Sequence, residues 1–448
     1  MQISATSPKL VVTSANTFWK SSEAVESGAA LDEFGQLKAE FGDKIEVGAT
    51  TFSETTGQKI RRTTSGWVKK LPYILLGAGA LGVSVASAGL LAPLAAAGVA
   101  GAAAGGLSVA WLGGGLSDAV KRTTNAQGLA AHHTGFETLN FENLPQESGP
   151  EAGLREMTIK NMEIYPQARH VVHLNGHGHG AKSFAGLPAR EAHQSMVEAV
   201  QKTGRKYDVV FYETCYGANW ENLHQQAEVA DYAVAFEDAI PKSNTRIGRL
   251  DLSDILQAGV ENKSDREVAV EMARTAGRHF DGKEAPIAAI PFPKRLAPVN
   301  KKTMSTNTDS TAVAVDLTSL RQDLSPSLDR LGVILTKELK ENAQVKEAAR
   351  NAQQRNLLES SGDLVDLGGF LRDLREAVQG AEKQEAFDQA LRAMDSALLH
   401  KRTGEKLPLS GLSFHSKPDK MNFSNPASPA HQDPTLPKGW LSFIDRAF

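Results

Sequence analysis

Short apolar segments with the composition of β-strands alternate along this chain with segments of helical periodicity. The expected strands are residues 9–14, 45–52, 170–174, 207–212 and 232–237. The expected helices are residues 29–41, 154–165, 190–204, 220–230 and 253–277, with two amphipathic regions, 319–357 and 368–399, after them. Strands that alternate with helices in this way form a mostly parallel sheet covered by helices. The pattern therefore predicts an α/β fold.

The alternation is interrupted by 47 consecutive residues, 71–117, that contain no Asp, Glu, Lys, Arg or His. A helix needs about 20 apolar residues to cross a bilayer, so this run fits two crossings with a turn near Pro93. Lys70 before it and Lys121 after it place both ends on the same side by the positive-inside rule. The run predicts a hydrophobic helical hairpin in a membrane. A Gly/Ala-rich buried hairpin or a flexible loop of a soluble protein is the alternative.

Charge and cysteine content exclude several classes of protein. The 49 Lys and Arg residues nearly balance the 52 Asp and Glu residues, so a basic nucleic-acid-binding face is not expected. The single cysteine, Cys215, excludes an intramolecular disulfide framework and a cysteine-rich zinc site. The first residues lack a charged segment followed by an apolar core, so no cleavable signal peptide is expected.

The cysteine follows one expected strand, and two histidines follow the strand before it. Cys215 comes after residues 207–212, whereas His177 and His179 come after residues 170–174, each followed by glycine. Open α/β sheets carry their functional residues at the carboxyl ends of the strands, and consecutive strands are usually neighbours. A thiol beside an imidazole is the arrangement that thiolate catalysis requires. These two strand ends therefore predict a Cys–His catalytic site.

Two further residues fit such a site. The backbone N–H of Gly178 together with that of Cys215 would form an oxyanion hole. Glu213, two residues before the cysteine, would pair with a cation of the substrate. Because His170 and His173 lie within a strand, they are expected to be core or edge residues.

At these residues the sequence resembles the clostripain-like (C11) cysteine peptidases of the caspase, legumain and gingipain group. That group has an apolar strand that ends in His-Gly, and a next strand that ends in a short motif with the nucleophilic Cys. Glu213-Thr214-Cys215 is similar to the acidic-small-Cys motif of the clostripain-like branch. Other segments with the resemblance are residues 9–53, Arg61-Arg62, Tyr165-Pro166, 230–241, 365–370 and 410–414.

The resemblance covers most of residues 8–416 and implies a caspase-haemoglobinase-like α/β/α sandwich with a mostly parallel sheet. The expected parts are residues 1–65 (first β-α-β part), 66–126 (inserted hydrophobic hairpin), 127–300 (catalytic part with the His and Cys strands), 301–416 (C-terminal helical part) and 417–448 (a tail rich in Pro, Ser and Asn).

The resemblance also implies roles for individual residues. Cys215 is the nucleophile, and His177 is its partner, with His179 as the alternative. Glu213 lines the S1 pocket and selects Arg or Lys at P1. Family members are often matured by a cut at a basic residue between the two strands, for which Arg190 is the first candidate and Lys182 the second.

The expected partners are protein or peptide substrates with Arg or Lys at P1, and a lipid bilayer through residues 71–117. No cofactor and no metal are expected. Calcium use occurs in the family, but no loop of carboxylates at EF-hand spacing is present. The expected location is at a membrane, and a bacterial secreted effector would fit a peptidase with these features.

Two other functions account for part of the pattern. A zinc hydrolase would use the His177-x-His179 pair with His173 or Glu213, but it leaves Cys215 without a role. A catalytically degenerate caspase-fold protein would act as a membrane-inserting effector or scaffold. The presence of Cys215, a His-Gly pair and Glu213 in one chain favours the peptidase over both.

Overall fold

The computed structural model describes residues 8–18, 37, 40–53, 129–134, 150–184, 187–240, 252–278, 311–358, 361–402, 409–416 and 435–448. In this part of the chain a central sheet has the strand order β11-β9-β8-β7-β4-β1-β2-β3. Its strands are β1 (Leu10–Phe18), β2 (Ile45–Ser53), β3 (Leu129–Thr134), β4 (Arg169–Gly176), β7 (Tyr207–Thr214), β8 (Ala230–Phe236), β9 (Ala312–Asp316) and β11 (Leu398–Arg402). The remaining strands form two small sheets: β5 (Ser183–Phe184) with β6 (Leu187–Pro188), and β10 (Leu364–Asp366) with β12 (Ser413–His415).

The five central strands are parallel, and the strands at both edges are antiparallel to their neighbours. β2, β1, β4, β7 and β8 pair in parallel, whereas β3 and β9 pair antiparallel with β2 and β8, and β11 pairs antiparallel with β9. Most side chains of β4 and β7 are buried, as expected for strands covered on both faces. The predicted α/β fold with a mostly parallel sheet is therefore confirmed.

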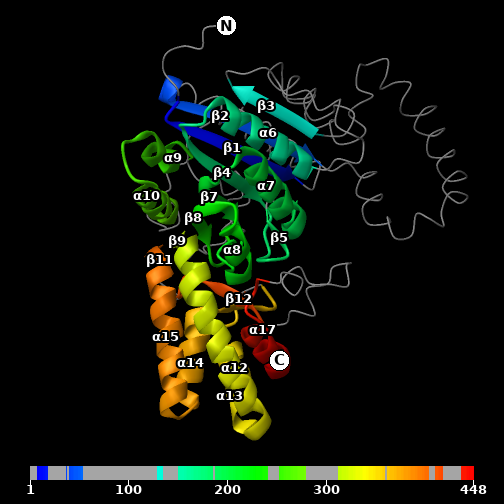
Figure 1. The fold of residues 1–448 in the computed structure, drawn as a ribbon, viewed down its shortest axis with the longest axis vertical. Coiled ribbons are helices and arrows are strands. Elements are labelled where there is room, and N and C mark those ends of the chain that lie inside the picture. The colour runs from blue at the N-terminus through cyan, green and yellow to red at the C-terminus, as the bar shows by residue number, and fades with distance from the viewer. Residues whose placement is uncertain are drawn as a thin grey trace, which may run out of the picture.

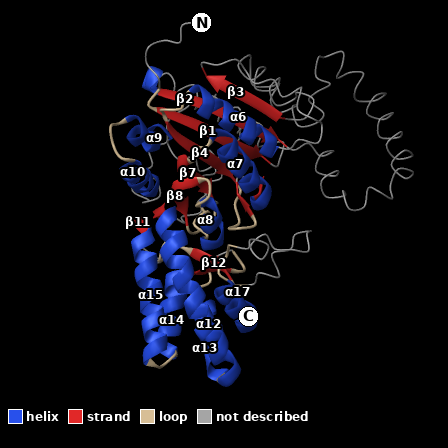
Figure 2. Ribbon diagram, viewed as in Figure 1, coloured by secondary structure: helices blue, strands red, loops and turns tan. Residues whose placement is uncertain are grey.

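Helices cover both faces of the sheet (Figures 1 and 2). α6 (Pro150–Ile164), α7 (Ala189–Thr203) and α8 (Trp220–Gln226) contribute to the hydrophobic cluster on one face. α9 (Leu252–Val260) and α10 (Asp265–Arg278) contribute to the cluster on the other face. In α7 the buried residues Ala189, Ala192, Met196 and Ala199 recur every three or four positions, so a single apolar stripe packs on the sheet. A short 3-10 helix, η2 (Gly42–Lys44), leads into β2.

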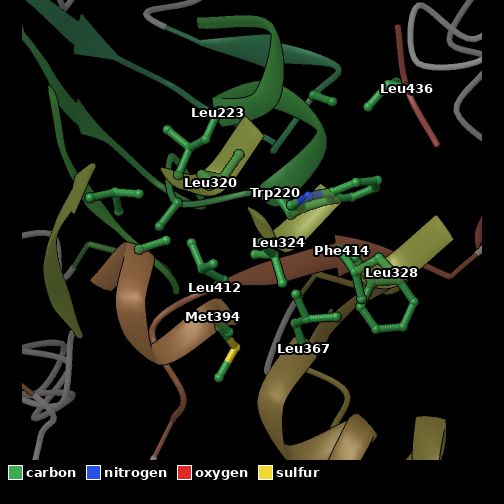
Figure 3. Close-up of a cluster of buried hydrophobic side chains, with 14 of the residues drawn as sticks. Trp220, Leu223, Leu320, Leu324, Leu328, Leu367, Met394, Leu412, Phe414 and Leu436 are labelled. Atoms are coloured by element: carbon green, nitrogen blue, oxygen red, sulfur yellow. The ribbon is translucent and has the colours of Figure 1, made fainter. Parts of the chain in front are cut away.

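Helices, several of them long, continue the fold beyond the β9–β11 edge (Figure 1). They are α11 (Leu317–Ser319), the π-helical turn η8 (Leu320–Leu324), α12 (Ser325–Glu341), α13 (Ala343–Arg355), α14 (Leu367–Ala377), α15 (Ala381–Ala397) and α17 (Lys438–Ala447). Trp220 and Leu223 of α8 share one buried cluster with Leu324, Leu367 and Phe414 (Figure 3). The sheet and the C-terminal helices are thus joined by one hydrophobic core.

Several elements differ from the sequence expectation. β3 and β9 are not among the expected strands, β11 begins within the expected helical region 368–399, and α17 lies in the expected tail 417–448. β11 is a short edge strand with His, Lys and Arg, a composition that lacks strand periodicity but suits an edge. α17 is held by tertiary packing, because Trp440 and Phe443 are fully buried.

The predicted membrane hairpin, residues 71–117, lies outside the described residues. Among the helices that are described, none has the length and apolar composition needed to cross a membrane.

Candidate active site

The ends of β4 and β7 lie side by side in the sheet. The two strands pair in parallel, with Asn175 opposite Glu213 and Gly176 opposite Thr214. The next residues, His177 and Cys215, therefore leave neighbouring strands at the same edge. The proximity expected for the two strand ends is confirmed.

Gly178 packs directly on the cysteine strand. A Cβ placed on Gly178 would lie 2.8 Å from both Cβ and Oγ1 of Thr214, and closer still to the carbonyl oxygen of Cys215. Real Cβ atoms essentially never show such contacts. Glycine is therefore required here, because its main chain approaches the main chain of Cys215 more closely than any side chain permits.

The cysteine itself lies at a sharp turn between β7 and α8. Cys215 is partly buried, and Tyr216 after it has a φ of 56°, the only positive φ among the described non-glycine residues. Two backbone bonds hold this turn: the N–H of Tyr216 donates to Asp238 O (3.0 Å), and the N–H of Ala218 donates to Phe236 O (2.9 Å). A strained residue fixed in this way is a common feature of functional sites.

The two candidate histidines have different surroundings. His177 is exposed and directly follows β4. His179 is partly buried, with Nε2 3.4 Å from Oδ1 of Asp363 and with its ring edge-on to Tyr216 at a centroid distance of 5.9 Å. The imidazole of His179 thus contacts the C-terminal region, whereas His177 stands opposite the cysteine by strand register.

Asp363 was not singled out from the sequence, yet it lies beside the histidine loop. Its Oδ2 is 2.6 Å from Nζ of Lys182 and 3.3 Å from Nδ1 of His415. Burial alone would raise the pKa of Asp363, but hydrogen bonds from His179, His415 and Lys182 hold it well below its usual value. Asp363 is 181 positions from Lys182 in the chain, so only the tertiary fold brings them together.

Glu213 is buried and paired with a histidine. Its Oε2 lies 2.9 Å from Nε2 of His173, and the two side chains are 4% and 1% exposed. On the other side of the ring, Nδ1 of His173 is 3.0 Å from Oγ of Ser14, and the ring stacks on Phe211 at 5.2 Å. A row of polar side chains therefore crosses β1, β4 and β7 and ends two residues before Cys215.

Solved structures with a similar fold are C11 cysteine proteases, although no protein family and no curated protein matches the sequence. The secreted C11 protease "iotapain" of Bacteroides thetaiotaomicron superimposes with a TM-score of 0.52 at 9% identity, over 98% of this chain and 99% of that one. An inactive zymogen C11 protease of Parabacteroides distasonis gives 0.51 at 11% identity, over 100% of both chains. The chain has the C11 protease fold. The resemblance read from the sequence is thus confirmed at the level of the fold.

A third C11 structure, the secreted B. thetaiotaomicron protease with an irreversible peptide inhibitor, gives a TM-score of 0.50 at 10% identity, over 97% of this chain and 99% of that one.

The two basic residues expected as processing sites differ in exposure. Arg190 is exposed in the first turn of α7, whereas the side chain of Lys182 is 11% exposed and paired with Asp363.

Two of the histidines that a zinc site would use, His173 and His179, contact different carboxylate groups. His173 contacts Glu213, and His179 contacts Asp363. No group of three or more His, Cys, Asp or Glu side chains suited to a metal ion occurs among the residues described.

Proposed function

We propose that this protein is a cysteine endopeptidase with Cys215 as nucleophile and His177 as general acid and base. The observation that carries the proposal is the contact of Gly178 with the main chain of Cys215, because it joins the histidine loop to the cysteine turn. A partly buried thiol at the carboxyl end of a parallel strand, in a C11 fold, supports the same function.

The proposed reaction follows from these positions. His177 takes the proton of the thiol, and the sulfur of Cys215 attacks the scissile carbonyl. The N–H groups of Gly178 and Cys215 stabilise the negative oxygen of the tetrahedral intermediate. The C–N bond then breaks, the leaving amine receives the proton from His177, and a thioester remains. Water activated by His177 hydrolyses the thioester and restores the thiol.

The choice of His177 over His179 rests on position. His177 directly follows β4, opposite Cys215 by strand register, whereas Nε2 of His179 lies 3.4 Å from Oδ1 of Asp363. His177 has the exposure that a substrate-facing base needs. The variants His177→Ala and His179→Ala, compared for thiol alkylation at pH 6, distinguish the two, since loss of the true base slows alkylation more.

We propose a preference for Arg or Lys at P1, with Glu213 as the source of negative charge. The buried pair with His173 fixes the Glu213 carboxylate at the level of the strand end. A substrate cation would share this carboxylate with His173.

Self-processing is proposed at Arg190, with Lys182 as the second site. The greater exposure of Arg190 favours it, since a peptide bond must open locally before a peptidase can bind it. An Arg190→Gln variant that still yields the wild-type fragments on a denaturing gel would move the assignment to another basic residue.

The decisive experiment is incubation of the purified full chain with fluorogenic Arg, Lys and norleucine peptides, beside Cys215→Ala. We expect cleavage by the wild type only, with Arg or Lys preferred. If no peptide is cleaved, and if the biological effect of the protein persists in Cys215→Ala, the degenerate scaffold is the correct interpretation.

We further propose that residues 71–117 tether the peptidase to a membrane, because the run is uncharged and is long enough for two crossings. Secretion is proposed by analogy with the neighbour described as secreted. Carbonate extraction of the full chain and of a variant lacking residues 66–126 tests the tether. Equal solubility of the two would refute it.

A further inference from the structure

The loop of residues 177–182 is held at two ends by different parts of the molecule. At one end Gly178 packs on Cys215, and the ring of His179 contacts Tyr216. At the other end Lys182 forms its 2.6 Å ion pair with Asp363, in surroundings where the two side chains are only 11% and 9% exposed. The loop thus spans the distance between the nucleophile and one buried carboxylate.

His415 links the same carboxylate to the main chain of the loop. Its Nε2 accepts the N–H of Ala181 (3.2 Å), so the proton of the neutral ring must be on Nδ1, 3.3 Å from Oδ2 of Asp363. Burial lowers the pKa of His415 to about 4, so the ring is neutral at pH 7. A neutral His415 therefore receives one hydrogen bond from the loop and gives one to Asp363.

Asp363 itself has a rigid support. Its carbonyl oxygen accepts the N–H (2.9 Å) and the hydroxyl (3.0 Å) of Ser416. The next residues form β10, which pairs with β12, the strand that carries His415. The carboxylate and the imidazole that hold the loop are thus fixed relative to each other by one small sheet.

We propose that Asp363 is a positioning residue for catalysis: through His179, Lys182 and His415 it fixes the 177–182 loop so that His177 is held beside Cys215. The proposal rests on the proposed function of Cys215 and His177. It assigns to the C-terminal region a direct part in the geometry of the catalytic site, because Asp363 and His415 both come from that region.

The test is Asp363→Asn in the full chain, which keeps the shape of the side chain and removes its charge. We expect kcat to fall roughly 10- to 100-fold while KM changes by less than about threefold, since a misplaced base affects the reaction more than binding. We also expect alkylation of Cys215 by iodoacetamide at pH 6 to slow about tenfold, since the thiolate loses its imidazolium partner. Asp363→Glu should restore part of both.

The matched control is Asp388→Asn, which removes the partly buried pair of Asp388 on α15 with Arg375 on α14 (2.8 Å). It should leave kcat, KM and alkylation unchanged. A purely structural role for Asp363 would lower the number of titratable thiols but leave kcat per thiol and the alkylation pH profile unchanged, and this outcome would overturn the proposal.

Two outcomes need a second measurement. If Asp363→Asn does not fold, Lys182→Gln removes the same ion pair at its more exposed end, and an unchanged kcat per thiol in that variant refutes the positioning role. If the wild type cleaves no peptide, the proposed function fails. The alkylation profiles of wild type and Asp363→Asn then still decide whether Asp363 positions an imidazole beside the thiol.

Discussion

The sharpest consequence of the site geometry concerns Gly178. In Gly178→Ala the new methyl group would lie 2.8 Å from two atoms of Thr214 and closer still to the carbonyl oxygen of Cys215, whereas ordinary contacts begin at 3.4 Å. Backbone and a buried strand surround the methyl group, so these neighbours cannot simply rotate away. The loop that carries His177 must therefore move off the cysteine strand.

The size of the effect follows from this displacement. Relief of the contacts requires a shift of roughly 1 Å, and a misplacement of that size can reduce a reaction rate about 100-fold, equivalent to about 2.7 kcal/mol in the activation free energy. Overpacking of this kind also costs about 1–3 kcal/mol in the free energy of unfolding. We expect kcat/KM to fall about 100-fold in a protein that is still folded at 25 °C.

The assay is cleavage of an Arg peptide by Gly178→Ala, with urea denaturation to measure stability. Gly277→Ala is the matched control, because its new Cβ would lie 2.7 Å from Cδ and 3.1 Å from Cβ of Arg402, an overpacked contact between α10 and β11 rather than at the ends of β4 and β7. The control should keep full activity. If Gly178→Ala stays within twofold of the wild type in kcat/KM, the contact of the loop with Cys215 is not needed for catalysis, and the proposed oxyanion hole is wrong.

Two other predictions follow from buried carboxyl groups. Glu213→Gln keeps an acceptor for His173 but removes the negative charge. A hydrogen bond to a charged group contributes about 1.5–3 kcal/mol, so selectivity for Arg over norleucine at P1 should fall about 10- to 100-fold. The rate of thiol alkylation should not change. Equal selectivity in both proteins would refute the S1 role. Burial raises the pKa of Glu221 from 4.5 to about 7. Protonation of this carboxyl group therefore adds to the free energy of unfolding; the contribution is complete below pH 4.5 and is lost as the pH rises through 7. In urea denaturation, the free energy of unfolding of Glu221→Gln should fall about 3 kcal/mol less than that of the wild type between pH 4 and pH 8, and equal decreases would contradict this account.

The central sheet could be predicted because its signal is local. Each central strand is a short apolar run, and α7 carries a stripe at helical spacing, so periodicity alone locates them. β9, β11 and α17 could not be predicted as readily, since they are short and are stabilised by pairing or by burial of Trp440. Their stability arises from contacts with distant segments, which no local pattern records.

The candidate site could likewise be predicted only where it depends on local sequence patterns. Cys215, Gly178 and His177 follow two consecutive strands, so the rule for parallel sheets brings them together without further information. The role of His173 as partner of Glu213 was missed, because strand position alone suggested a core residue. The positions of Asp363 and His415 beside the histidine loop could not be predicted, since their contacts with Lys182 and Ala181 depend on how the C-terminal region packs.

Two buried carboxyl groups join the edge that carries Cys215 to the C-terminal region. Burial raises the pKa of Glu237 well above its ordinary value, with nearby Asp366 raising it further, and Glu221 is affected by burial in the same direction. A raised pKa means that burial disfavours the charged form of each carboxyl group. Both follow closely on strand ends at the edge that carries Cys215: Glu237 directly follows β8, and Glu221 is the second residue of α8, after β7. Each carboxyl group accepts a backbone N–H from the C-terminal region: Glu221 from His415 (2.9 Å) and Glu237 from Gly411 (2.6 Å). An apolar residue at either position would leave a buried N–H without its partner, at a cost of about 1–3 kcal/mol. The two costly groups therefore anchor the C-terminal region to the edge that carries Cys215, and the proposed positioning role of Asp363 depends on that contact.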